Sequence, residues 1–157
     1  MKDSQLYFMQ LAIREAEKAF YKDEVPIGCV IVHQGKVLAK AHNLVEKSQN
    51  ATKHAEVVCI EKATKKLKNF RLSDCVLYTT LEPCLMCCGA ILLSRVKKIV
   101  YAAKDIRHGA LVSVFQVFEN KHPIHTPIYE QGPLEKESSD LLKAFFKIKR
   151  AKNEKSI

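Results

Sequence analysis

The sequence CVLYTTLEPCLMCCGAILLSRVKKIVYA, residues 75–102, decides the fold. Its first part, residues 75–80, has the β-branched and aromatic side chains of a strand, and Pro83 follows in a position suited to the first turn of a helix. The apolar run Leu85 to Leu93 continues that helix, and residues 98–102 (KIVYA) return as a strand. A strand, a helix and a second strand in this order predict a β-α-β unit with parallel strands.

Upstream of this unit, the chain begins with a predicted helix and a predicted hairpin. Apolar residues recur at helical spacing from Leu6 to Phe20, which predicts an amphipathic helix over about residues 4–21. Residues 28–33 (GCVIVH) and 36–42 (KVLAKAH) have the composition of strands and flank a Gln-Gly dipeptide typical of a turn. We therefore expect a β-hairpin, with the helix covering one face of the sheet.

A second predicted helix lies between the hairpin and the β-α-β unit. The polar stretch 46–52 (EKSQNAT) predicts a loop, and helical periodicity then runs from His54 to Lys68. Asn50 or Thr52 can cap this helix, because short polar side chains accept hydrogen bonds from free N–H groups at a helix start. His54 is therefore expected at the beginning of the helix.

The last third of the chain is predicted to be irregular and then helical. Residues 103–133 lack a clear period and contain two glycines and three prolines, so we expect mostly irregular structure with short elements. Apolar residues between Leu141 and Ile148 then alternate with Lys and Arg, which predicts a basic amphipathic helix at about 137–152. No linker or repeat divides the sequence, so residues 1–157 are expected to form a single domain that includes this helix.

The composition of the 157-residue chain is that of a globular protein outside membranes. Hydrophobic residues make up 47%, which excludes a disordered or collagen-like chain. The N-terminal segment carries charges where a signal peptide would be apolar, and no apolar run reaches the length of a membrane span. Six cysteines are too few for a secreted disulfide scaffold of this length. We therefore expect a cytoplasmic protein with no membrane partner.

The chain is strongly basic. Lys and Arg number 26 against 17 acidic residues, which gives a formal net charge of +9. Such a charge attracts polyanions and raises their rate of association, so nucleic acid is the first partner to consider. A generally basic surface on an enzyme of small molecules is the alternative that charge alone leaves open.

Two short motifs carry the chemistry of the sequence. His54-Ala55-Glu56 precedes Pro83-Cys84-Leu85-Met86-Cys87, and H-x-E followed by P-C-x-x-C is the signature of zinc deaminases. Cys84 and Cys87 are three residues apart, so their sulfurs point the same way from the helix that Pro83 begins. His54 and Glu56 are two apart and serve one site only if they project from the first turn of their helix. The spacing therefore predicts two helix N-termini that meet at one zinc ion.

Three protein ligands, His54, Cys84 and Cys87, indicate a catalytic rather than a structural metal. A structural zinc site normally has four protein ligands, whereas three leave one position open for water. Zinc lowers the pKa of that water to near 7 and so makes a nucleophile available at neutral pH. Glu56 is the expected proton shuttle between the water, a ring nitrogen of the base and the leaving ammonia. The other cysteines are expected in the core, and Cys88 points about 100° away from Cys87 around the helix.

With these motifs the chain resembles the cytidine deaminase-like superfamily and, within it, the bacterial tRNA-specific adenosine deaminases. The resemblance implies an α/β fold of three α/β/α layers around a mixed five-stranded sheet, one zinc ion per subunit and a homodimer. A partner subunit is one way to cover the predicted helix from Cys84 to Leu93, which is apolar nearly all round. The matching segments are VPIGCVIV (25–32), AHN (41–43), ATKHAE (51–56), LYTTLEPCLMCCGAI (77–91), SRVKKIVYAAKD (94–105) and FFKIKR (145–150).

The resemblance also implies a substrate, the wobble adenosine of a tRNA anticodon loop. Hydrolysis at C6 of adenine would give inosine and ammonia, and unstacked loop bases suit this chemistry because they enter a pocket without melting a duplex. Asn43 would hydrogen-bond the base, and the backbone near Leu81 and Glu82 would hold its exocyclic amine. The pocket would be lined by Val25, Pro26 and Ile27.

Contacts to the anticodon stem-loop are implied for a loop and for the basic last helix. Phe145 and Phe146 have an equally good alternative, in which both pack inward. Ile124 departs from the family pattern, which has Asn before the position of His125, and Cys88 replaces a commoner alanine. The residues implied to contact RNA are Lys104, Asp105, Arg107, His125, Phe145, Phe146, Lys147, Lys149 and Arg150.

Two other functions remain open from the sequence. A deaminase of a free base or nucleoside, such as guanine, cytosine or cytidine, would share the catalytic core, but it has no need of a +9 charge or a basic helix. A nucleic-acid-binding module with a structural zinc would need a fourth protein ligand, either Cys88 or a cysteine remote in the sequence.

Overall fold

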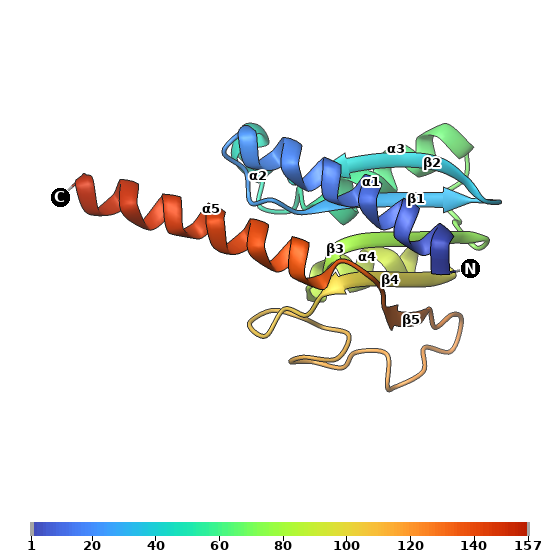
Figure 1. Cartoon of the computed structure of the whole chain (residues 1–157). Coiled ribbons are helices and arrows are strands. Elements are labelled where there is room, and N and C mark those ends of the chain that lie inside the picture. Colours follow the sequence, from blue (N-terminus) through green and yellow to red (C-terminus); the bar gives the residue numbers. More distant parts are fainter. Residues whose placement is uncertain (1, 157) are drawn as a thin grey trace.

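A five-stranded sheet lies at the centre of the structure, a computed structural model that describes residues 2–156 (Figure 1). In chain order the elements are α1 (Lys2–Tyr21), β1 (Gly28–His33), β2 (Lys36–His42), α2 (Val45–Ser48), α3 (Ala55–Leu67), β3 (Cys75–Leu81), α4 (Leu85–Leu93), β4 (Lys98–Ala103), β5 (Ile128–Gln131) and α5 (Glu135–Lys155).

The sheet is mixed, with the strand order β2-β1-β3-β4-β5. The hairpin strands β1 and β2 are antiparallel, and β1 is also antiparallel to β3. β3, β4 and β5 run parallel to one another, and α4 forms the crossover between β3 and β4. The predicted hairpin and the predicted β-α-β unit are therefore confirmed.

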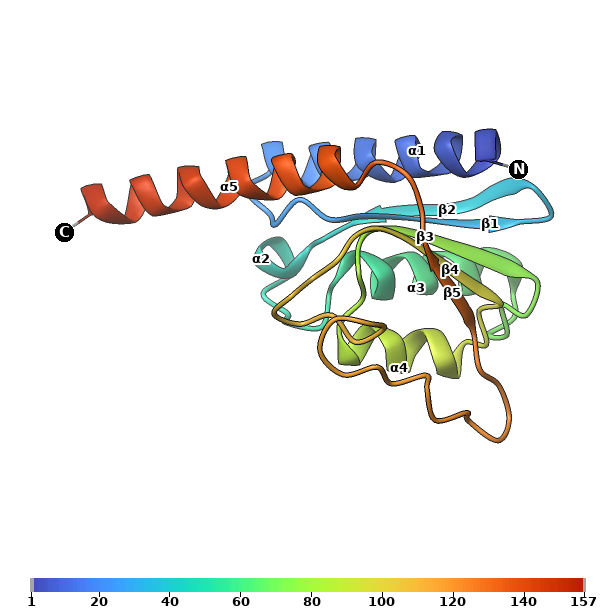
Figure 2. The same cartoon turned by 60° about the horizontal axis from the view of Figure 1, so that its bottom comes forward.

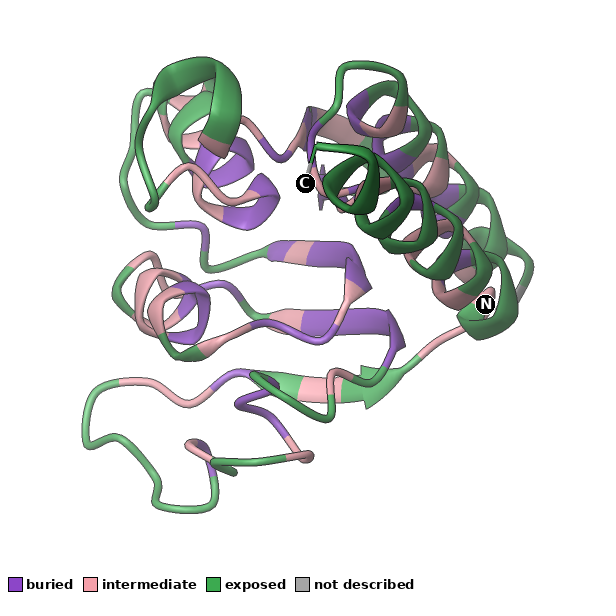
Figure 3. Cartoon of the chain, turned by 90° about the vertical axis from the view of Figure 1, so that its left-hand side faces the viewer, coloured by how far each residue is buried: buried purple, intermediate pink, exposed green. Residues whose placement is uncertain are grey.

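Helices cover both faces of the sheet, so the fold has three layers (Figure 2). α1 and α5 lie on one face, and α3 and α4 lie on the other. Successive strand residues point to opposite faces, so each strand contributes side chains to two hydrophobic cores. Ile31, Leu77 and Ile99 belong to the core on the α3 and α4 side. The core on the α1 side contains Val30, Tyr78 and Val100. Figure 3 shows buried residues along the strands and the inward sides of the helices, whereas the C-terminal end of α5 is exposed.

Close packing fixes α1 on the sheet. A Cβ at Gly28 would lie 2.0 Å from the carbonyl oxygen of Ala12, so only glycine allows β1 to approach the helix this closely. α5 joins this layer at the end of α1, where the rings of Phe20 and Phe145 have centroids 6.0 Å apart. The two helices thus form one layer behind the strands.

The structure corrects some sequence expectations. The predicted loop at 46–52 overlaps the single-turn helix α2, and α5 extends beyond the predicted 137–152. Neither Asn50 nor Thr52 caps α3: the N-cap is His54, which makes no capping hydrogen bond, and Asn50 instead accepts hydrogen bonds from Thr52. Among the helices of residues 2–156, none combines the length and apolarity that a membrane crossing requires.

Candidate active site

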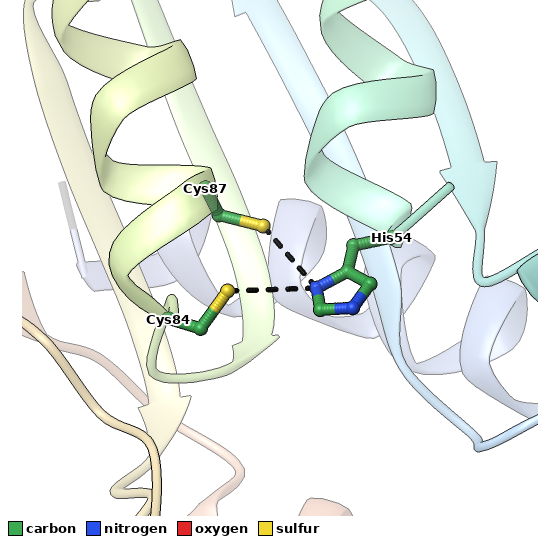
Figure 4. Close-up of side chains that lie close together, drawn as sticks. All are labelled: His54, Cys84 and Cys87. Atoms are coloured by element: carbon green, nitrogen blue, oxygen red, sulfur yellow. Dashed lines mark hydrogen bonds between the residues drawn. The ribbon is translucent and has the colours of Figure 1, made fainter. Parts of the chain in front are cut away.

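The starts of α3 and α4 face each other and bring the two motifs together (Figure 4). His54 is the N-cap of α3 and Cys84 the N-cap of α4, and both have extended backbone. Glu56 and Cys87 follow within the first turns. The free N–H groups and the dipole at a helix start favour negative charge, so both helices stabilise an ionised thiol or carboxylate at this point.

Three side chains present donor atoms suited to one metal ion. Nδ1 of His54 lies 3.6 Å from Sγ of Cys84 and 3.5 Å from Sγ of Cys87. The three donor atoms lie within 4.8 Å of one another. In a tetrahedral zinc site with bonds of about 2.3 Å to sulfur and about 2.0 Å to nitrogen, a sulfur and a nitrogen ligand are separated by about 3.5 Å. The two distances from Nδ1 of His54 therefore match a zinc site built from these three residues.

Hydrogen bonding couples the titration of the two thiols. The contact with Cys87 lowers the pKa of Cys84 to about 4, against the opposing effect of burial and with help from His54. The same contact and burial raise the pKa of Cys87. The pKa of His54 is raised, chiefly by its hydrogen bond with Cys84. A metal ion binds deprotonated thiols, so its uptake here should release protons.

Glu56 lies beside the three candidate metal ligands, with 4% of its surface exposed. Its Oε2 lies 3.3 Å from Sγ of Cys87, and its Oε1 lies 2.8 Å from the hydroxyl of Thr79 on β3. Burial raises the pKa of Glu56, and the hydrogen bond with Thr79 partly offsets that effect. A raised pKa brings a carboxyl group closer to the range in which a general acid–base catalyst works.

The site opens into a cleft of about 1000 Å³, and its lining includes three parts of the chain. His54, Glu56 and Cys84 belong to the first part, at the helix starts. The segment 104–108 and Phe115 form a second part. The third part is one face of α5, whose cleft-lining residues are Ser139, Leu142, Lys143, Phe146 and Arg150.

Asn43 carries a buried acceptor without a partner in this cleft. It is 5% exposed and lines the cleft, and its Oδ1 accepts no hydrogen bond from any residue in the described part of the chain. An unpaired buried polar atom costs about 1–3 kcal/mol unless a ligand satisfies it. Asn43 is therefore placed to bind a donor group on a bound molecule.

The predicted base-binding residues lie around the cleft with one exception. Val25, Ile27, Asn43, Leu81 and Glu82 line it. Pro26 is buried and is not among the lining residues.

The residues predicted to contact RNA divide into two groups. Lys104, Asp105, Arg107, Phe146 and Arg150 line the cleft, and the remaining four lie outside it. Of those four, Phe145 is buried with 5% exposure, Lys147 is exposed, Lys149 forms a 3.0 Å ion pair with Asp23, and His125 donates from Nε2 to the carbonyl oxygen of Val96 at 2.7 Å.

Sequence reasoning missed several residues of the site. Thr79 lies within β3 and belongs to neither sequence motif. Strand residues two positions apart point to the same face, so Thr79 lies on the same face as Leu81, the face toward α3. Ser139, Leu142 and Lys143 share a helical stripe with Phe146, and that stripe is visible in the sequence once the facing element is known. The buried carboxylate of Glu24 was also missed: it accepts hydrogen bonds from the N–H groups of Glu46 and Lys47 and holds α2 at the cleft.

Comparisons with known proteins agree with this geometry. Residues 2–150 match the family model of MafB19-like deaminases. The chain is 46% identical to a tRNA-specific adenosine deaminase of Aquifex aeolicus over 90% of this chain and 93% of the relative. It is 43% identical to a tRNA-specific adenosine deaminase of Bacillus subtilis over 97% of this chain and 94% of the relative.

A solved structure is also similar. It comes from a study of A-to-I editing by tRNA:A34 deaminases at the wobble position of transfer RNA. It superimposes with a TM-score of 0.84 at 39% identity, and the match covers 87% of this chain and 99% of the other. The mixed sheet and its helices are therefore those of a cytidine deaminase-like fold.

Proposed function

The chain belongs to the MafB19-like deaminases and to the tRNA-specific adenosine deaminases, and on that premise we propose that it hydrolyses the wobble adenosine of a tRNA anticodon loop to inosine and ammonia. The observation that carries the proposal is a three-ligand metal site beside a buried carboxylate, at the base of a large cleft. We take residues 1–157 as one deaminase domain that acts in the cytoplasm, where tRNA is available.

Zinc is the metal that these ligands favour, with one ion per subunit. Nδ1 of His54 and Sγ of Cys84 and Cys87 would hold it, because imidazole and thiolate are preferred zinc ligands. With its fourth position open, bound zinc would supply a water of lowered pKa as the nucleophile at neutral pH.

Glu56 moves the protons of the reaction. It accepts a proton from the attacking water, passes it to a ring nitrogen of adenine and later protonates the amine that leaves as ammonia. Thr79 supports both protonation states of Glu56, because its hydroxyl lies 2.8 Å from Glu56 and 3.1 Å from the carbonyl oxygen of Leu81. It donates to Glu56 when that group is ionised, and to Leu81 when Glu56 itself donates.

The base lies against Asn43, whose unpaired oxygen accepts a hydrogen bond from it. Val25 and Ile27 supply apolar contact, and Pro26 between them restricts the backbone. The backbone at Leu81 and Glu82 faces the exocyclic amine. Together these groups orient C6 toward the nucleophile, and orientation of this kind lowers the barrier by several kcal/mol.

The anticodon stem-loop binds along the rim of the cleft. Phe146 is 43% exposed and offers a ring on which an unstacked base stacks, and such stacking contributes about 1–3 kcal/mol. Lys143 and Arg150 on the same helix face, with Lys104 and Arg107 opposite, attract the phosphates. The basic rim and the net charge of +9 favour RNA over a free base as substrate.

A homodimer is the assembly that the surface of α4 favours. Leu85 and Leu93 are 47% and 74% exposed on a helix made mostly of apolar residues. A second copy of the chain that covers this face would remove the exposed apolar surface from water.

A structural-zinc module is the less favoured alternative. Within residues 2–156, the metal-binding group contains three ligands and lacks a fourth. Cys88, the candidate for that role, directs its sulfur to the carbonyl oxygen of Pro83 at 3.8 Å.

The test is a substrate comparison. Purified protein is incubated separately with bulk tRNA, adenosine, cytidine and guanine, and ammonia and inosine are assayed. We expect inosine only in the tRNA reaction, with an affinity that falls as salt rises. Release of ammonia from a free base, with no inosine formed in tRNA, would overturn the proposal in favour of a small-molecule deaminase.

A further inference from the structure

Glu82 is a buried carboxylate with no part in metal binding or proton transfer, yet it makes more hydrogen bonds than Glu56. Glu82 is only 2% exposed. Oε2 accepts backbone N–H groups from Leu111, Val112 and Ser113 at 3.1, 3.0 and 3.1 Å. Oε1 accepts the N–H of Asp105 at 3.2 Å and the hydroxyl of Ser113. Five donors satisfy the carboxylate, so its burial is compensated.

These donors come from both ends of one segment, residues 105–113, which follows β4 and has no strand or α-helix of its own. Such a segment orders only if its backbone N–H groups find acceptors. Asp105 satisfies the N–H groups of Arg107 and His108 at the tip, and Glu82 satisfies those at the base. The segment therefore depends on two carboxylates for its shape.

Gly109 provides an independent sign that the segment is built around Glu82. A Cβ at this position would lie 2.3 Å from Oε2 of Glu82 and 2.5 Å from the carbonyl oxygen of Asp105. Any larger residue would displace the carboxylate from the N–H groups that it accepts. The hydrogen bonds of the Glu82 carboxylate thus require glycine at position 109.

The anchored segment carries part of the cleft rim. Asp105, Ile106, Arg107 and His108 line the cleft, and Phe115 follows shortly after the anchor. A rim that is ordered before binding does not lose conformational freedom when RNA binds, whereas a loose rim would lose it at a cost to affinity. The affinity for RNA is therefore expected to depend on Glu82.

We propose that Glu82 is a positioning residue for RNA recognition: its carboxylate, seated against Gly109, holds residues 105–113 in the shape that receives the anticodon loop. This inference rests on the proposed function. It separates the role of the Glu82 side chain, which acts on binding, from that of Glu56, which acts on turnover.

The experiment compares Glu82→Gln and Gly109→Ala with the parent protein. Gln has one acceptor oxygen in place of two, and Ala displaces the carboxylate from a position outside the metal motif. Glu15→Gln is the matched control, because Glu15 is also buried, with 5% exposure, but pairs with His42 and Lys18 on the α1 side. Measurements are Kd and KM for an anticodon stem-loop RNA, kcat, zinc per chain, and amide hydrogen exchange of residues 105–113.

We expect both rim variants to raise Kd and KM roughly tenfold, because loop ordering then opposes binding. Gly109→Ala, which alters no group that contacts the base, should keep kcat within about twofold of the parent. Zinc content stays at one per chain and amide exchange in 111–113 becomes faster. Glu15→Gln changes none of these. The double variant should be no worse than the worse single variant, since both changes break the same hydrogen bonds.

Two results would overturn the inference: unchanged Kd, KM and exchange in both variants, or a fall in kcat with KM unchanged. A parent protein that binds the RNA without deaminating it would contradict the proposed function, while Kd and exchange would still decide the role of Glu82. If one variant fails to fold, the other gives the same measurements.

Discussion

The proposed metal centre and the proposed RNA-binding rim share one cleft but are built in different ways. His54, Glu56, Cys84 and Cys87 lie at or within three residues of a helix N-cap, and the sheet fixes how the two helix starts face each other. The rim joins segments that are far apart in the chain, residues 104–115 and one face of α5. Local backbone geometry sets the first region, and tertiary hydrogen bonds and packing set the second.

This difference separates chemistry from recognition. Changes at the helix starts alter the reacting groups and should act on kcat or on metal content. Changes on the rim alter how RNA is held and should act mainly on KM. Each prediction below contrasts the two regions, beginning with the largest effect.

Loss of a metal ligand should affect only the first region and be the most severe change. Cys87→Ser replaces a thiolate with a weak ligand, so we expect less than one zinc per chain and activity lower by about a thousandfold or more. Zinc content and inosine formation are measured together. Full activity in a zinc-free protein would contradict the metal assignment.

Thr79→Val should impair the catalytic role of Glu56 and leave metal binding unchanged. Valine keeps the volume but removes a hydrogen bond to a buried charged group, a loss of about 1.5–3 kcal/mol that corresponds to roughly a ten- to hundredfold lower kcat. The pH–rate profile should shift to higher pH, because the hydrogen bond with Thr79 lowers the pKa of Glu56. Thr79→Ser restores the hydroxyl and should restore the profile. An unchanged profile in the valine variant would show that Thr79 only packs.

The adjacent residues Phe146 and Phe145 should respond in opposite ways. Phe146→Ala removes an exposed ring of the rim and should raise KM for tRNA roughly tenfold, with little effect on Tm. Phe145→Ala removes a buried ring packed on Phe20 and should lower the free energy of unfolding by about 3 kcal/mol. Thermal melts and steady-state kinetics on both variants check this contrast. Equal KM values for Phe146→Ala and the parent would show that Phe146 does not contribute to RNA binding.

Glu15, outside both regions, gives the smallest effect. Its hydrogen bond with His42 lowers the pKa of Glu15 from 4.5 to about 2, with help from Lys18 and against the effect of burial. A depressed folded-state pKa stabilises the protein above pH 4.5, and that contribution is lost as pH falls toward 2. The parent should therefore lose about 2 kcal/mol more than Glu15→Gln over this range, as measured by urea unfolding. Parallel curves for the two proteins would contradict this.

The sequence was sufficient for the elements that local chemistry determines. The hairpin and the β-α-β unit follow from periodicity, and short motifs suffice to bring together the candidate ligands His54, Cys84 and Cys87, because each helix start positions its own side chains. The start of α3 was predicted, but its cap was not: Asn50 and Thr52 bond to each other, and the backbone at His54 takes the N-cap position without a side-chain partner.

Tertiary contacts were beyond the reach of sequence patterns. Phe145 and Phe146 are adjacent aromatic residues, and only the placement of α5 against α1 buries the first and exposes the second. The five hydrogen bonds of Glu82 connect it to residues 23–31 positions away in the chain. Helical and strand periodicity relates only residues that are close in sequence, so it cannot predict these contacts. The contacts of Thr79 with Glu56 likewise depend on how α3 packs on the sheet.

The most direct test of the account is the behaviour of Glu56→Gln, which keeps the shape of the side chain but removes its capacity to carry protons. The account predicts one zinc per chain, unchanged affinity for an anticodon stem-loop RNA, and loss of inosine formation by at least about a hundredfold. Inosine formation at the rate of the parent protein would contradict it.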